Sequence, residues 1–178
     1  NLIHKYFYSG PMFRREKPQA GRLRQFHQIG VEFLGNHEYH LDIEVIMLAE
    51  KLMEFLGIRN KLKLEINTLG SSSSRKQYSV ALKEYFNLKK TSLSDENKKR
   101  LNLNPLRILD SKNEEDRSII QSAPKIFDFL DDESKAFFNK ILSTLENLNI
   151  DFKVNPFLVR GLDYYNHTTF EYITNENK

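Results

Sequence analysis

The chain has 178 residues, of which 39% are hydrophobic and 29% are charged, a balance typical of globular proteins rather than disordered or fibrous ones. It contains no cysteine, which excludes a disulfide framework and a thiolate metal site and fits the cytoplasmic location that we expect. No apolar run is long enough to cross a bilayer, so we expect no membrane-spanning segment.

The first third of the chain is predicted to form strands and one helix. Leu2–Tyr8 is rich in β-branched and aromatic residues, which predicts a strand that ends at Gly10. Gln25–Leu34 is predicted as a second strand, antiparallel to the first and joined to it by a long basic loop. Apolar residues at three- and four-residue spacing predict a helix over His40–Leu56, and alternation predicts a strand over Lys61–Asn67.

The middle of the chain is predicted to be almost entirely helical. Gly70 and the serines at 71–74 are interpreted as a hinge. We therefore expect residues 71–153 to form a helical domain inserted into a domain built from residues 1–70 and 154–178. Its expected helices are Arg75–Asn87, Ser94–Leu103, one capped by Asn113, and Asp132–Leu148.

Strand-like sequence returns near the end of the chain. Phe152 and Val154 alternate, and Tyr164–Thr174 is predicted as a sheet strand. The predicted fold class is therefore α+β, an antiparallel sheet flanked by helices with an all-helical insertion. Because the sequence begins and ends within strand-like runs, we expect it to be an internal piece of a longer protein.

A basic patch lies between the first two predicted strands. The net charge of the chain is +3, but the range 12–24 alone holds five arginines and lysines against the single acid Glu16, a local net of 5 − 1 = +4. A nucleotide phosphate or an RNA backbone is the partner that such a patch favours, and a solvated basic loop is the alternative. Neither a P-loop nor a dinucleotide-binding fingerprint occurs in the sequence.

The residues around this patch can form a nucleotide clamp. Arg14 can fork onto a phosphate with two parallel hydrogen bonds, and Phe26 can stack on a flat base. Glu16 can bind an exocyclic amine of the base or pair with a neighbouring arginine. On the second strand Phe26, Gln28 and Glu32 share parity, so they point to one face, with Gly30 leaving room between them.

Two long, separated motifs resemble those of the histidyl-tRNA synthetase family. The pattern FRRE, loop, RQFHQIGVE is similar to motif 2 of class II aminoacyl-tRNA synthetases, and RGLDYYNHTTFE resembles the histidine-specific signature. NPLRILDSKN, at Asn104–Asn113, resembles the inserted region of the bacterial enzymes. The resemblance implies a histidine–tRNA ligase, which activates L-histidine with ATP and Mg²⁺ to histidyl-adenylate and transfers it to tRNA(His), and which is a homodimer at full length.

The resemblance also implies roles for residues on the nucleotide side of the site. Arg14 and Arg160 match catalytic arginines that hold the α-phosphate of ATP. Arg22 matches a loop arginine that reaches the outer phosphates, and Phe26 matches the ring under adenine. An ordinary structural salt bridge is the alternative explanation for Arg14 and Arg160, and plain core packing is the alternative for Phe26.

On the amino-acid side, the resemblance implies a histidine pocket. Gln28 and Glu32 match residues that bind the amine and imidazole of histidine, and Tyr164 and Tyr165 match tyrosines that line the pocket. Sheet core is the alternative for both tyrosines. The His-Glu-Tyr-His run at 37–40 lacks the spacing of a zincin helix, so we expect no metal ligands.

Two rival functions remain open from the sequence. One is a non-catalytic histidyl-tRNA synthetase-like regulatory subunit, and the other is a basic RNA-binding module without chemistry. The family's motif 1, motif 3 and anticodon-binding region are absent from these residues, so we expect the chain alone to be inactive even if its parent is a working ligase.

Overall fold

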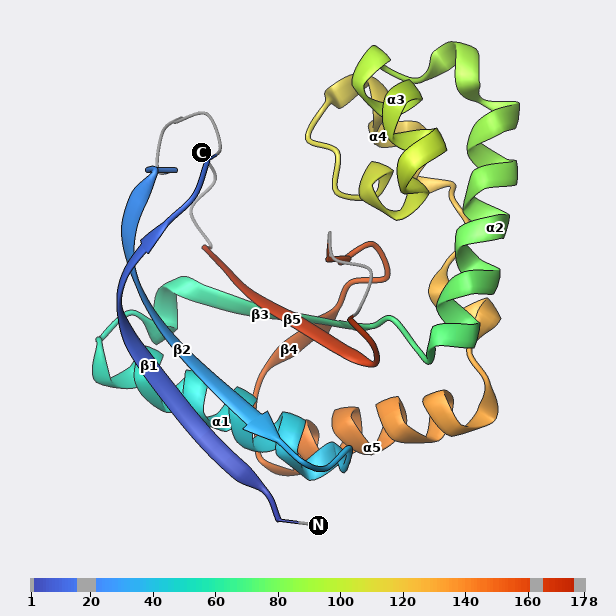
Figure 1. Cartoon of the computed structure of the whole chain (residues 1–178). Coiled ribbons are helices and arrows are strands. Elements are labelled where there is room, and N and C mark those ends of the chain that lie inside the picture. The colour runs from blue at the N-terminus through green and yellow to red at the C-terminus, as the bar shows by residue number, and fades with distance from the viewer. Residues whose placement is uncertain (1, 16–21, 161–164, 175–178) are drawn as a thin grey trace. The chain divides into compact units, whose positions relative to one another are not determined.

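The computed structural model describes residues 2–15, 22–160 and 165–174 (Figure 1). The chain divides into two compact units, residues 1–48 and 49–178, and the division falls inside a helix. Among the described residues, none of the helices has the length and apolar character needed to cross a membrane.

An antiparallel hairpin forms most of the first unit. β1 (His4–Phe13) pairs with β2 (Gln25–Leu34) along their whole length, in a register that sets Tyr8 opposite Gly30. The antiparallel pairing and the limits of the second strand are confirmed. The even-numbered residues of both strands share one face, because directly opposed residues of a ladder point to the same side.

The predicted end of the first strand at Gly10 is wrong, since β1 continues through Gly10 and Pro11 to Phe13. The hairpin is a two-stranded sheet, so β1 has an unpaired edge. A proline, which lacks a backbone N–H, is tolerated on such an edge.

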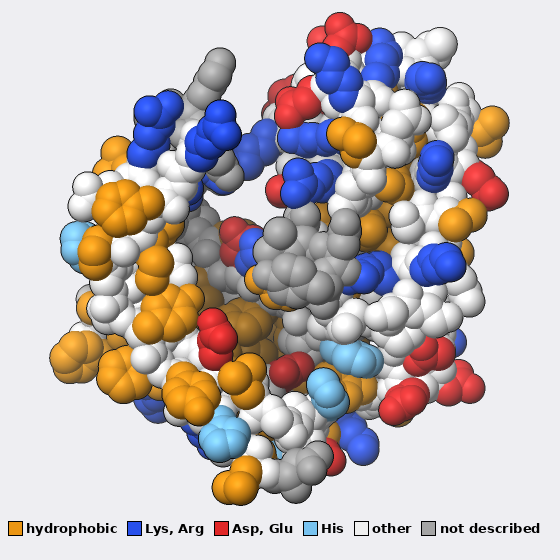
Figure 2. Space-filling view, in the orientation of Figure 1, with side chains coloured by type: hydrophobic (Ala, Val, Ile, Leu, Met, Phe, Trp, Pro, Cys, Tyr) orange, Lys and Arg blue, Asp and Glu red, His pale blue; other side chains and the backbone are white. Residues whose placement is uncertain are grey.

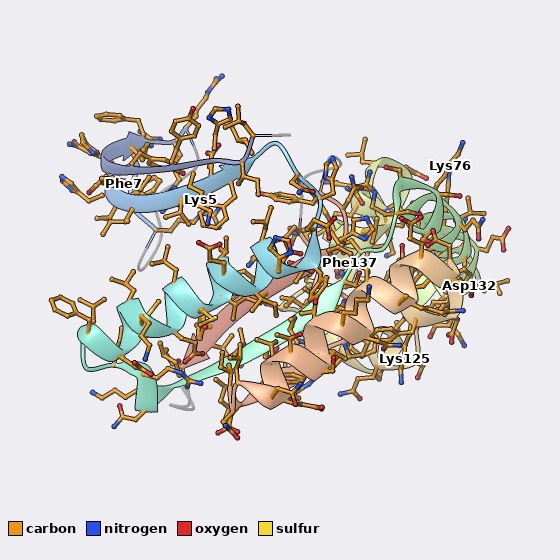
Figure 3. All side chains as sticks on the ribbon, turned by 90° about the horizontal axis from the view of Figure 1, so that it is seen from below. Lys5, Phe7, Lys76, Lys125, Asp132 and Phe137 are labelled. Carbon is orange, nitrogen blue, oxygen red and sulfur yellow. The ribbon has the colours of Figure 1, made fainter. Side chains whose placement is uncertain are left out.

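The helix α1 (Tyr39–Phe55) begins and ends within one residue of the predicted limits. Its first half is tied to the hairpin by Lys5, labelled in Figure 3, whose ammonium lies 2.5 Å from the Glu44 carboxylate and 5.0 Å from the centre of the Phe33 ring. Both charged side chains are nearly half exposed, so this ion pair adds little stability. In the second half of α1, the buried Glu50 accepts a hydrogen bond from the Tyr172 hydroxyl at 2.8 Å and another from Arg59.

A second sheet has the strand order β4–β3–β5. β3 (Leu62–Thr68) pairs antiparallel with β5 (Thr168–Thr174), as an antiparallel sheet predicts, but it pairs parallel with β4 (Phe152–Val154). The helices between β3 and β4 explain the parallel pair, because a parallel neighbour requires a long crossover connection. Of the predicted last strand, the part before Thr168 is not β-structure where it is described.

The long connection between β3 and β4 is helical, as predicted. Its helices are α2 (Ser72–Leu88), α3 (Asp95–Leu103), α4 (Glu114–Gln121) and α5 (Asp132–Asn147), with short 3₁₀ turns at Lys90–Ser92, Pro105–Ile108 and Ile126–Phe129; a further 3₁₀ turn, Arg59–Lys61, precedes β3. The core of this region is formed around α2, where Tyr78, Leu82 and Phe86 have no exposed surface. Burial of each such side chain contributes roughly 1.5–3 kcal/mol.

The serines that follow β3 do not form the predicted hinge. Ser72 already begins α2, and Ser71 caps it by accepting a hydrogen bond from the Ser74 amide at 3.1 Å. Serine favours helix caps because its hydroxyl satisfies an N–H that the first turn leaves unpaired. Gly70 turns the chain into the helix with φ of 64°, a conformation in which a side chain is strained.

A carboxylate, Asp131, joins the first turns of α2 and α5. It accepts hydrogen bonds from the Ser71 hydroxyl at 2.5 Å, the Ser74 hydroxyl at 3.0 Å and the Ser134 amide at 2.7 Å. These bonds, that of Ser71 first, hold the pKa of Asp131 well below its usual range. The first turns of the two helices therefore share one carboxylate as hydrogen-bond acceptor.

Helix α5 contacts both the helical core and the sheet side of the second unit. The Phe138 ring lies 5.8 Å from that of Phe127, and the ring of Phe137, labelled in Figure 3, lies 4.8 Å from that of His167, next to β5. The division of the chain into residues 1–70, 71–153 and 154–178 stays a prediction.

Candidate functional site

Arg14 is held at the end of the hairpin by three contacts. Its amide continues the ladder to the Arg24 carbonyl at 2.9 Å, and its side-chain Nε donates to the Leu23 carbonyl at 2.8 Å. Its guanidinium carbon lies 4.4 Å from the centre of the Phe26 ring, within the range of a cation–π interaction. The structure thus brings two predicted nucleotide-binding side chains into direct contact.

The same end of the hairpin carries the basic patch. Arg15, Arg22 and Arg24 are exposed, and Figure 2 shows Lys and Arg side chains gathered at this end of the strands. Glu16 lies outside the described residues. The patch remains the strongest local concentration of positive charge that the sequence predicts.

The even-numbered face of β2 presents the amide and the carboxylate predicted for histidine binding. Gln28 and Glu32 are both exposed on it, and Gln28 Nε2 donates to the hydroxyl of Tyr8 at 2.9 Å. The room expected above Gly30 is occupied by that tyrosine, since a Cβ added to Gly30 would lie 2.2 Å from its ring. Any side chain at this glycine would displace Tyr8.

Tyr8 is a residue of this site that sequence reasoning missed. An aromatic residue directly opposite a glycine on a neighbouring strand is a recurrent pairing, and it was the signal that could have found Tyr8. The signal required the strand register, which the predicted strand end at Gly10 obscured.

Arg160 makes two contacts with β5. Its Nη2 donates to the Phe170 carbonyl at 3.1 Å, and its Nη1 lies 3.4 Å from the Glu171 carboxylate. The ion pair matches the structural alternative for this arginine. Both side chains are more than two-fifths exposed, so the pair contributes about 1 kcal/mol or less, and exchanging it for a phosphate costs little.

Tyr165 precedes β5 and is not a core residue, because 41% of its surface is exposed. Its backbone carbonyl accepts a hydrogen bond from Arg75 of α2. Tyr164 lies outside the described residues.

Asn67, at the end of β3, is a second residue that sequence reasoning missed. It is fully buried, and its Nδ2 donates to the Leu158 carbonyl at 2.9 Å. Its Oδ1 has no hydrogen-bond partner among the residues that the structure describes. The alternation of β3 predicts only a half-buried strand, so nothing in the sequence distinguished Asn67 from a surface amide.

The second unit has two open cavities, one of which is lined in part by Arg75, the donor to the Tyr165 carbonyl. One, of about 440 Å³, lies at the start of β3 and β4 and is lined by Arg59, Lys63 and Asp151 among others. The other, of about 420 Å³, lies between α2 and the turn at Pro105 and is lined by Lys76 and Leu103 among others. In the described part of the chain, no three His, Asp or Glu side chains are grouped so that they could hold a metal ion.

The predicted site is divided between the two compact units. Arg14, Phe26, Gln28 and Glu32 belong to residues 1–48, whereas Arg160 and Tyr165 belong to residues 49–178. That the two groups converge on one ligand stays a prediction.

Sequence comparison identifies relatives of this chain. The family model of histidyl-tRNA synthetase matches residues 1–177. Curated relatives called histidine–tRNA ligase, from two strains of Streptococcus pneumoniae, are 51% identical over 170 residues, which cover 96% of this chain and 39% of each relative. The chain therefore spans about two-fifths of the length of these relatives.

Solved structures that resemble this chain include two proteins named as histidyl-tRNA synthetase or histidine–tRNA ligase. The crystal structure of apo histidyl-tRNA synthetase from S. aureus is 38% identical and superposes with a TM-score of 0.70, covering 94% of this chain and 38% of that one. A histidine–tRNA ligase subunit from Alicyclobacillus acidocaldarius is 16% identical with a TM-score of 0.54, covering 98% of this chain and 58% of that one. The second likeness concerns the fold alone.

Proposed function

The chain belongs to the histidyl-tRNA synthetase family, and from this premise we propose that it is a segment of a histidine–tRNA ligase. Its fold is that of a class II synthetase fragment, with mixed sheets and helices. The proposed activity belongs to the full-length protein, and the chain alone is expected to be inactive.

The proposed first reaction forms an acyl-adenylate. A carboxylate oxygen of L-histidine attacks the α-phosphorus of ATP, the bond to the β-phosphate oxygen breaks, and pyrophosphate leaves. The histidyl group is then transferred to tRNA(His), and AMP is released. Because two anionic groups must approach each other in the first step, fixed cations supply most of the stabilisation that a protein can offer.

The contact of Arg14 with Phe26 is the observation that carries this proposal. The Arg14 Nε–H is used by the Leu23 carbonyl, so a phosphate would be bound through the two Nη groups at the end of the fork. Phe26, half-buried beneath the guanidinium, offers a ring on which adenine can stack. Arg22, exposed in the same patch, is proposed to reach the outer phosphates. Glu16 is proposed to bind the exocyclic amine of the base.

Arg160 is the second proposed catalytic arginine. Its contacts with Phe170 and Glu171 hold the side chain extended along β5. Since the ion pair is exposed and weak, the guanidinium is available to the α-phosphate in the proposed complex. We propose that Arg14 and Arg160 bind the α-phosphate from two sides.

Recognition of histidine is proposed to use paired hydrogen bonds. Gln28 is oriented by Tyr8, and Glu32 is exposed two positions beyond Gly30 on the same strand face. A carboxylate and a phenol suit the two nitrogens of imidazole, so Glu32 is proposed to act with Tyr164 and Tyr165. Such a pocket rejects amino acids that lack those nitrogens, because its polar groups would be left unpaired.

Mg²⁺, the homodimer and the cytoplasmic location are further proposals that follow from the family. The described residues contain no acidic cluster for a metal, so no step is assigned to Mg²⁺, which would be carried by the phosphates of ATP. The helical region, residues 71–153, is proposed as the inserted domain of the family.

Histidine-dependent exchange between ATP and labelled pyrophosphate, measured on the full-length protein, tests the proposal. We expect exchange with L-histidine and none above background with glutamine or asparagine. Binding of tRNA without any exchange would instead favour a regulatory subunit of the same family.

A further inference from the structure

Arg75 connects the first helix of the helical region to the signature segment. Its Nη1 donates to the backbone carbonyl of Tyr165, 90 positions further along the chain. Both residues belong to the second compact unit. A guanidinium that reaches a carbonyl at this distance in sequence fixes the backbone of the acceptor relative to its own helix.

Residues 165–167 are fixed to the start of α2 by further bonds. The His167 amide donates to the Gly70 carbonyl at 2.9 Å, and the His167 carbonyl accepts from the Leu69 amide at 2.7 Å. The Ser72 hydroxyl lies 3.3 Å from Oδ1 of Asn166. His167 itself adopts a left-handed conformation with φ of 52°, so the chain turns sharply two residues after Tyr165.

The base from which Arg75 extends is itself rigid. The first turn of α2 is capped by Ser71 and joined to α5 through Asp131. A Cβ added to Gly70 would lie 2.6 Å from the Leu130 side chain and 2.8 Å from Cβ of Ser74. The turn is therefore closely packed, and Arg75 starts from a fixed position one turn further on.

The backbone just before Arg160 is held by Asn67. Its buried side chain donates to the Leu158 carbonyl, two residues before Arg160. Arg160 thus follows closely on a carbonyl that is held by Asn67, and Tyr165 carries the bond from Arg75.

We propose that Arg75 is a positioning residue for histidine recognition. It holds the backbone of Tyr165 so that the phenol of that residue meets the imidazole of the substrate. This inference rests on the proposed function and adds a residue of the helical region to the histidine pocket. Arg75 acts through Tyr165 and does not itself touch the substrate.

The chemistry of the contact explains why histidine, rather than ATP, is affected. A hydrogen bond from a charged donor is stronger than a neutral one, and its loss removes the direct anchor of the Tyr165 carbonyl, while the bonds of Asn166 and His167 remain. A shift of about 1 Å in a binding group suffices to lose its interaction. Of the proposed nucleotide contacts, Arg14 and Phe26 belong to the hairpin, and Arg160 has its own contacts with Phe170 and Glu171.

A double-mutant cycle in the full-length enzyme tests this role. Arg75→Ala, Tyr165→Phe and the double variant are compared in histidine-dependent pyrophosphate exchange, with Arg75→Lys as the conservative variant. Lys83→Ala, an exposed cation on the same helix, is the matched control. The Michaelis constants for histidine and for ATP and the melting temperature are measured for each protein.

Arg75→Ala is expected to raise the Michaelis constant for histidine about 10-fold, as for one lost charge-assisted hydrogen bond, and that for ATP less than about 3-fold. Arg75→Lys should restore part of the affinity, and Lys83→Ala should change neither constant. In the Tyr165→Phe background Arg75→Ala should have almost no further effect, because residues that act together are not additive.

Three results would overturn the inference. If the two substitutions raise the Michaelis constant for histidine by factors that multiply in the double variant, Arg75 does not act through the Tyr165 phenol. Equal increases for histidine and ATP, or a lower melting temperature with unchanged constants, would show a merely structural role. If Arg75→Ala does not fold, the ratio of the two constants in Arg75→Lys decides. Absence of exchange in the unsubstituted enzyme would overturn the proposed function as well. If the unsubstituted enzyme shows normal exchange, the variants test the role of Arg75 alone.

Discussion

The hairpin and the helical region differ in how far their aromatic side chains are buried. In the hairpin, Phe7 is 80% exposed and Phe13 is 74% exposed. In the helical region, Tyr78 and Phe86 have no exposed surface and pack within one continuous core. Both regions are rich in aromatic residues, so composition does not separate them.

Stability and ligand binding are therefore expected to depend on different regions of this chain. The helical region holds Tyr78 and Phe86 in its own core, whereas in the hairpin Gln28 and Glu32 are exposed on the even-numbered face. Substitutions in the helical core are therefore expected to change stability, and substitutions on the hairpin face are expected to change ligand binding.

Phe86→Ala should produce the largest effect on stability. Removing a fully buried phenylalanine costs about 3–5 kcal/mol through lost burial and the cavity left behind. We expect a corresponding fall in the free energy of unfolding of the second unit, measured by urea denaturation of the chain. Val80→Ala, at a half-exposed position on the same helix, is the control and should change it by less than about 1 kcal/mol. Equal effects of the two would erase the contrast between the regions.

Glu32→Ala should reverse this pattern. In the full-length enzyme we expect the Michaelis constant for histidine to rise about 10- to 100-fold, as for the loss of a hydrogen bond to a charged group. The constant for ATP and the melting temperature should hardly change, because Glu32 is exposed. Glu38→Ala, an exposed carboxylate beyond the hairpin, serves as the control. A large loss of stability in Glu32→Ala would assign this carboxylate a structural role.

Asp131→Asn should give the smallest effect, and one that depends on pH. The pKa of Asp131 is lower in the folded chain than in the unfolded one, so its contribution to stability is complete above the unfolded value of about 4 and declines as the pH falls further. At pH 7 we expect the variant to melt a few degrees below the unsubstituted chain, and at pH 3 the gap should narrow. Asp132→Asn, at the neighbouring exposed carboxylate, should show no such trend, and a gap independent of pH would exclude the shared-carboxylate role of Asp131.

The elements of the fold were predictable where the apolar pattern is periodic. The helix at Tyr39–Phe55 and the strand at Gln25–Leu34 were predicted within one residue, because amphipathic spacing depends on the chain alone. The parallel pairing of β3 with β4 was not predicted, since pairing is decided by a connection of more than 80 residues. The serines after Gly70 are predicted as a hinge because composition does not show that Ser71 caps α2 or that Ser71 and Ser74 donate hydrogen bonds to Asp131.

The candidate site was predictable in its motifs but not in its supports. Phe26, Gln28 and Glu32 share a strand face because β-strands alternate, and this needs no tertiary information. Tyr8 contacts the predicted residue Gln28 from the neighbouring strand. Arg75 contacts the predicted residue Tyr165, which lies 90 positions further along the chain. The Tyr8 contact requires the strand register and the Arg75 contact requires the whole fold, so neither follows from local sequence alone.

Arg14 and Arg160 are proposed to stabilise the same phosphorus during adenylate formation. Single-turnover formation of histidyl-adenylate by the full-length enzyme tests it most directly, with ATP affinity measured separately for Arg14→Ala and Arg160→Ala. We expect each variant to form adenylate about 10²- to 10³-fold more slowly while ATP affinity falls only a few-fold. Equal losses in rate and in ATP affinity, or an unchanged rate in either variant, would contradict it.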